Sequence, residues 1–205
     1  MNSWTTGSNS SGERNKQEAS LDPMQLRQRL KRAPIESVAC PDRFFMASVI
    51  LLLYEKNSEP WVLTVLKSES RDYPWSNQVA LPGGHMDNQD DSPLDTALRE
   101  LTEELGITPD HLEVTGTMGH FFTIRQTVIE CFVAVWDGEK SGFFFDDREI
   151  ARVIEIPVAA LRSIHESGGF SGRIPDMSEL TYPYDGVVIW GVTARMIHFL
   201  LEHVI

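Results

Sequence analysis

The chain has 205 residues, of which 41% are hydrophobic and 23% are charged, and its formal net charge is −12. This length suits one domain with a sizeable core, and the composition is that of an ordinary soluble globular protein. The acidic balance argues against a nucleic acid or an anionic membrane as the main partner, because both need a basic surface. It leaves small phosphorylated substrates open, since a bound divalent cation reverses the local field.

The N-terminal segment has two parts of different character. Residues 1–20 are rich in Ser, Asn, Gly and charged residues and lack the apolar stretch of a secretory signal, so we expect a disordered tail. Residues 22–34 predict a short helix with Leu26 and Leu30 among its apolar residues and basic residues around them. Docking of this helix on its own domain is favoured over contact with a membrane or a partner.

The expected domain organisation is an N-terminal tail, disordered or partly helical, at 1–35 and a single domain at 36–205. The longest apolar run, residues 44–54, is far shorter than the ~20 residues that cross a bilayer. The two cysteines, Cys40 and Cys131, fit neither a disulfide framework nor a zinc spacing, which favours a reduced, cytoplasmic setting.

Along the domain, strands outnumber helices. Apolar runs bounded by turn residues predict strands at residues 44–55, 61–70, 112–122, 126–136 and the first part of 151–161. Residues 71–93 form a long loop with several Pro and Gly residues, and a loop of that length inside a compact domain is usually functional. A hairpin is predicted at 171–190 and a closing amphipathic helix at 190–204. The fold class is therefore α+β or a mixed-sheet α/β.

The loop runs into a well-marked helix. Ser92 is a good N-cap, Pro93 suits the first helical position, and Asp95 completes a capping box. Gly106 is placed to end the helix in the left-handed conformation. The core-facing stripe consists of the aliphatic residues Leu94, Ala97, Leu98, Leu101 and Leu105.

Three carboxylates, those of Glu100, Glu103 and Glu104, fall in a second arc beside that stripe. Like charges at this spacing repel by a few tenths of a kcal/mol per exposed pair. They are either a solvated face paired with Arg99 or a hard oxygen site for Mg²⁺ or Mn²⁺. Upstream, Gly83 and Gly84 allow close backbone approach to a ligand, and three further aspartates follow them, which favours the metal site.

These residues resemble the signature of the Nudix hydrolases, G-x5-E-x7-R-E-U-x-E-E-x-G-U, where U is aliphatic. Residues 99–107 match its second half completely; in the first half, fifteen positions rather than fourteen separate Gly84 from Arg99, and the upstream acid is Asp90 or Asp91. Residues 82–100 and 184–201 are similar to the coenzyme A pyrophosphatase-like branch, whereas Leu66 and Lys67 depart from that branch's L-L-T-x-R-S motif.

The resemblance implies an α/β/α sandwich with a mixed sheet, and a metal-dependent diphosphatase. The implied substrate is coenzyme A or an acyl-coenzyme A; a nucleoside-diphosphate sugar or a dinucleotide such as NADH is the alternative. A catalytically silent nucleotide sensor is the alternative of another class. Metal ligands would be Glu100, Glu103 and Glu104, with a backbone carbonyl of Gly83 or Gly84, and the ion Mg²⁺ or Mn²⁺.

Further roles follow from the same resemblance. Arg99 would orient the carboxylates, and the general base would be a glutamate of the motif or Glu149 in the acidic loop, which is otherwise an exposed acid. Tyr73 and Trp75 would meet the nucleotide from the glycine-rich loop. Phe121 would stack on adenine, although ordinary core packing is favoured for it. The oligomeric state, with a homodimer as one option, stays open.

Overall fold

The computed structural model describes residues 21–35, 45–69, 76–123, 127–138 and 143–205, and within them seven strands form one mixed sheet. Its central strands β1 (Phe45–Lys56) and β6 (Thr127–Trp136) are parallel. The remaining strands pair antiparallel: β2 (Glu59–Lys67) and β4 (Gly83–His85) with β1, β5 (Leu112–Phe122) with β6, and β3 (Val79–Ala80) and β7 (Ile150–Pro157) with β2. A separate hairpin joins β8 (Tyr182–Tyr184) and β9 (Val187–Ile189).

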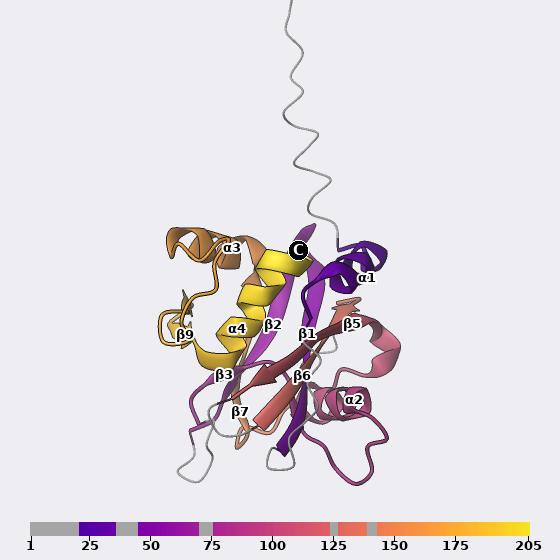
Figure 1. The fold of residues 1–205 in the computed structure, drawn as a ribbon. Helices are drawn as coiled ribbons and strands as arrows, with labels where there is room; N and C mark the ends of the chain where they lie inside the picture. The colour runs from indigo at the N-terminus through magenta and orange to yellow at the C-terminus, as the bar shows by residue number, and fades with distance from the viewer. Residues whose placement is uncertain (1–20, 36–44, 70–75, 124–126, 139–142) are drawn as a thin grey trace, which may run out of the picture.

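The sheet is covered on both faces. Strand β1 accordingly carries apolar side chains at successive positions. Ile50 and Leu52 belong to a core that includes residues of α2 (Pro93–Leu105), whereas Leu51 and Leu53 belong to a core shared with α1 (Pro23–Arg32), α3 (Val158–Ser167) and α4 (Gly191–Phe199). Alternation along a strand places these two sets on opposite faces. The result is the predicted α/β/α arrangement around a mixed sheet (Figure 1).

Helix α1 is docked on its own domain, as expected. Leu26 and Leu30 are buried in the core, and Arg27 forms an ion pair with Glu113 of β5. Figure 1 shows the C-terminus beside α1, where Arg29 donates a hydrogen bond to the carbonyl of Val204 at 3.3 Å. Residues 1–20, the part of the predicted tail expected to be disordered, and residues 36–44, at the start of the predicted domain, lie outside the described residues.

Helix α2 begins and ends where its sequence predicts. The Asp95 amide donates to the Ser92 hydroxyl at 3.2 Å, and that hydroxyl donates to the Asp95 carboxylate at 2.7 Å. Gly106 closes the helix with φ of 70°. Of the predicted core stripe, Ala97, Leu101 and Leu105 are fully buried, and the other two leucines pack partly buried beside them.

The segment before α2 differs from the predicted loop, because β3 and β4 add residues 79–80 and 83–85 to the sheet. Strands of two or three residues are too short to show an alternation of apolar and polar residues, so the sequence alone does not reveal them. They form through pairing with β1 and β2 in the folded chain. The closing helix α4 continues as a π-helical turn over Leu200–Val204. Among the described residues, the structure contains no helix with the length and apolar character needed to cross a membrane.

Candidate active site

Glu104 is the most deeply buried of the three glutamates of α2. Its Oε2 accepts a hydrogen bond from the amide of Gly83 at 3.1 Å, and its Oε1 is in close contact with Nζ of Lys67. Burial raises the pKa of Glu104, while the ammonium of Lys67 and the amide of Gly83 act in the opposite direction. Glu104 therefore lies where α2, β2 and β4 meet.

Lys67, the last residue of β2, connects Glu104 to the acidic loop. Its side chain is 4% exposed, and its Nζ lies 3.4 Å from Oε1 of the half-exposed Glu149. Glu149 is held there because the Ser68 amide donates to its carbonyl at 2.9 Å, extending the pairing of β2 with β7. The structure thus brings Glu149 next to Glu104, and Lys67 is the residue between them.

Sequence reasoning missed this role of Lys67. The available signal was a cation at the end of a strand whose preceding residues are almost all apolar. A lysine in such a position is rarely fully buried unless it is paired. Its partners, however, lie 37 and 82 positions further along the chain, so no local pattern indicated them.

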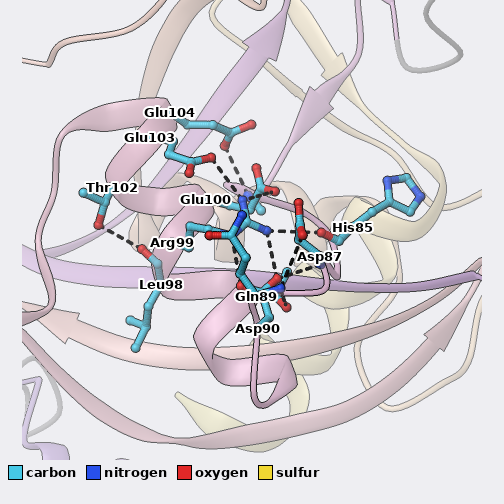
Figure 2. A network of polar contacts seen from close by, with 12 residues as sticks. His85, Asp87, Gln89, Asp90, Leu98, Arg99, Glu100, Thr102, Glu103 and Glu104 are labelled. Atoms are coloured by element: carbon cyan, nitrogen blue, oxygen red, sulfur yellow. Dashed lines mark hydrogen bonds and ion pairs between the residues drawn. The ribbon is translucent and has the colours of Figure 1, made fainter.

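Arg99 holds the other carboxylates in a network (Figure 2). Its Nε and Nη2 donate to the two oxygens of Asp90 at 2.9 and 3.0 Å, and its Nη1 donates to Glu100 and Glu103 at 2.9 and 3.0 Å. Nη2 also donates to the carbonyl of His85 at 3.3 Å. The guanidinium therefore holds two of the three glutamates of α2 close to the segment that carries β4.

Of the two upstream aspartates, Asp90 is the one engaged in this network. Hydrogen bonds from Arg99, from the amide of Asp87 and from the hydroxyl of Thr96 hold the pKa of Asp90 well below its usual range, against the opposing effect of burial. Its side chain is 3% exposed. Of Asp90 and Asp91, the two candidates for the acid of the motif, Asp90 is the one whose carboxylate binds Arg99.

Both glycines of the loop are required by close packing. A Cβ on Gly84 would lie 2.4 Å from Cδ of Glu100, and a Cβ on Gly83 would lie 2.2 Å from the carbonyl oxygen of Ser48. Gly83 also has φ of +145°, which side chains rarely adopt. Gly84 lets the carboxylate of Glu100 rest directly on β4, and Gly83 lets β4 approach the backbone of β1.

A cavity of about 200 Å³ opens beside Gly83 and Gly84. Gly83, Gly84 and Lys67 line this cavity, and so do Trp190 and Gly191 at the start of α4. The remaining wall is largely aliphatic and sulfur-containing, with Val79, Leu81, Ile129, Met177 and Met196 among its residues. Small-molecule sites are typically of this kind, apolar with a few placed polar groups.

The three aromatic residues expected at the substrate have different outcomes. Tyr73 and Trp75 lie outside the described residues. Phe121 is buried in the core, and its ring packs edge-on against Phe199 with the centroids 6.0 Å apart. It does not line the cavity, so we leave it out of the proposed substrate site; its packing is that of an ordinary core aromatic.

The residues present fit a divalent cation by the chemistry of their donors. Glu100, Glu103, Glu104 and Glu149 supply only hard carboxylate oxygens, and Gly84 leaves room against β4 that a Cβ would fill. In the described part of the chain no three acidic, His or Cys side chains already converge on one point. Lys67 and Arg99 instead neutralise these carboxylates.

This chain is similar in sequence to known proteins. A family model for the NUDIX domain matches residues 44–174. An uncharacterized Nudix hydrolase, NudL, of Enterobacter sp. (strain 638) is 30% identical over 156 residues, covering 75% of this chain and 80% of the relative. The protein of the same name from Photorhabdus laumondii is 30% identical over 161 residues, covering 77% and 84%.

Among solved structures, a MutT/nudix family protein from Enterococcus faecalis matches with a TM-score of 0.53. The match covers 95% of this chain and 73% of that protein, at 16% sequence identity. At that identity the likeness concerns the fold alone, and it agrees with the mixed sheet flanked by helices.

Proposed function

Since the chain belongs to the Nudix family and is a hydrolase of nucleoside diphosphate compounds, we propose that its substrate is coenzyme A or an acyl-coenzyme A. Water would add to one phosphorus of the diphosphate and the bridging P–O bond would break. The products would be 4′-phosphopantetheine, or its acyl form, and adenosine 3′,5′-bisphosphate.

One observation carries this proposal. The two segments that resemble the coenzyme A branch lie about a hundred residues apart in sequence, yet both line the same cavity. Gly83 and Gly84 come from the first segment, and Trp190 and Gly191 from the second. Residues that share a substrate-specific motif and a cavity are those expected to contact the same substrate.

In the mechanism we propose, Glu100, Glu103 and Glu104, with the carbonyl of Gly83, would hold the divalent cation, Mg²⁺ or Mn²⁺. When bound, this ion supplies the charge neutralisation and water activation on which phosphoryl transfer mainly depends. Arg99 keeps Glu100 and Glu103 in position through its 2.9 and 3.0 Å hydrogen bonds.

Glu149 is our choice as general base. Its side chain is half exposed and shares Lys67 with the buried Glu104, so it can take a proton from a water beside Glu104 and release it to solvent. A glutamate of α2 is the alternative base. The Glu149→Gln variant distinguishes the two.

A second candidate substrate is a nucleoside-diphosphate sugar or a dinucleotide. Leu66 and Lys67 favour it, because the coenzyme A branch carries a different motif at these positions. The chemistry at phosphorus would be the same, and the difference would lie in the group bound beyond the diphosphate.

The test is incubation of the purified full chain with coenzyme A and Mg²⁺, with products identified by mass spectrometry. Glu104→Gln serves as the inactive control, with its fold checked by circular dichroism. Phosphopantetheine and adenosine bisphosphate would support the coenzyme A proposal. Cleavage of nucleotide sugars or NADH but not of coenzyme A would refute it in favour of the second candidate.

A further inference from the structure

We propose that Lys67 is a diphosphate-binding residue that leaves Glu104 for the substrate when a divalent cation takes its place on that carboxylate. The inference deepens the proposed function and rests on it. It assigns a role in binding to a residue of β2 that lies outside the Nudix signature at residues 84–107.

The position of Lys67 is the first argument. Its Nζ contacts Glu104 and lies 3.4 Å from Glu149, yet the residue also lines the cavity beside Gly83 and Gly84. Among the described residues of the cavity wall, Lys67 is the one lysine or arginine. A diphosphate that enters the cavity can therefore contact Lys67.

The energetics of the ion pair give the second argument. Removing two charges from water costs several kcal/mol per ion, and well-packed apolar residues of similar volume often stabilise a fold as well or better. Lys67 and Glu104 have side chains only 4% and 2% exposed, so their pair pays this cost. We therefore expect a lysine to be buried at such a cost where its ammonium group also binds a second partner.

The charges around Lys67 indicate what this second partner is. Glu104 and Glu149 carry two negative charges against the single positive charge of Lys67. A divalent cation on Glu104 would add two positive charges beside Lys67 and would repel its ammonium group. A diphosphate would offset this added charge, and it accepts hydrogen bonds from the three donors of an ammonium group.

The experiment compares Lys67→Met with wild type in two binding measurements. Mn²⁺ binding is followed by electron paramagnetic resonance, and binding of α,β-methylene-ADP, a non-hydrolysable diphosphate, is followed by calorimetry at saturating Mg²⁺. We expect the variant to bind Mn²⁺ at least as tightly as wild type, because the competing ammonium is gone. We expect its affinity for the analogue to fall about tenfold or more, because a charge-assisted contact is lost.

Three further variants complete the design. Lys56→Met is the matched control, because Lys56 also has a carboxylate 3.4 Å away, in Glu155, but does not line the cavity; neither affinity should change. Lys67→Arg keeps the charge and should restore most of the analogue binding. If Lys67→Met does not fold, Lys67→Gln, which keeps a donor for Glu104, takes its place in both measurements.

The outcomes separate this inference from the proposed function. Unchanged analogue affinity in a folded Lys67 variant, with Mn²⁺ still bound, would overturn the inference alone. A parallel loss of Mn²⁺ and analogue binding would also overturn it, because Lys67 would then only support the carboxylates. Absence of Mn²⁺ binding by the wild-type protein would overturn the inference and the proposed function together.

Discussion

Gly84→Ala is expected to abolish most of the activity while leaving the fold intact. The new Cβ would lie 2.4 Å from Cδ and 2.5 and 2.7 Å from the two oxygens of the Glu100 carboxylate. Ordinary contact begins at 3.4 Å, so the carboxylate must retreat by about 1 Å. A displacement of about 1 Å in a catalytic group can cost about 100-fold in rate.

The same change should hardly affect stability. The atoms that clash are the far end of a flexible glutamate side chain, and Gly84 does not have a positive φ. Removal of a glycine also restricts the unfolded chain, which stabilises by about 0.4–1 kcal/mol where the backbone tolerates alanine. We therefore expect the free energy of unfolding to change by less than about 1 kcal/mol.

Gly83→Ala is the matched comparison. Its Cβ would lie 2.2 Å from the backbone oxygen of Ser48 and 2.6 Å from Cα of Val49, at φ of +145°. Strain at such a backbone position costs about 1–3 kcal/mol and overpacking about 1–3 kcal/mol more. This variant should lose about 2–6 kcal/mol of stability, because β1 and β4 must separate.

Urea unfolding and steady-state turnover of coenzyme A with Mg²⁺ measure both effects on the same preparations. If coenzyme A is not cleaved by wild type, the nucleotide that is cleaved replaces it. A folded Gly84→Ala protein with wild-type turnover would refute the idea that close packing of Glu100 on β4 builds the active site. Equal destabilisation by the two alanines would refute the distinction between side-chain and backbone clashes.

Three other substitutions test separate parts of the structure. Glu149→Gln should lower kcat about 10²–10⁴-fold with little change in KM if Glu149 is the base, and steady-state kinetics showing no change in kcat would assign that role to α2 instead. Asp90→Asn should lower the free energy of unfolding at pH 7; because Arg99 lowers the pKa of Asp90 in the folded protein, its contribution is complete above about pH 4 and is lost as the pH falls further. Urea titrations at several pH values check this, and a difference between Asp90→Asn and wild type that stays constant down to about pH 3 would contradict it. Leu30→Ala should cost about 2–5 kcal/mol in urea unfolding, since Leu30 is 3% exposed, and a neutral result would mean that α1 is not part of the folding unit.

The ends and the buried face of helix α2 follow from local sequence rules. Ser92 and Gly106 cap it at the predicted residues, and the fully buried Leu101 and Leu105 are two members of the predicted stripe. Strand β5 likewise covers the predicted residues 112–122. Caps and periodicity act over a few residues, so a single sequence contains the information needed to place these elements.

The acidic chemistry of the site was also readable from the sequence. Glu100, Glu103, Glu104 and Arg99 lie within two turns of one helix, and the structure joins Arg99 to Glu100 and Glu103 as neighbours on that helix. Helix geometry alone brings such residues together. The match to the Nudix signature rests on the same short stretch.

Contacts between distant segments were decided only by the tertiary structure. Lys67 meets Glu104 and Glu149 because β2 pairs with β7 while α2 packs beside β4, and none of these residues is near another in sequence. The choice of Asp90 rather than Asp91 as the partner of Arg99 was likewise left open by the sequence and decided by the structure. Side-chain pairing across a sheet depends on strand order and register, and these are set by burial of the whole core rather than by any local pattern.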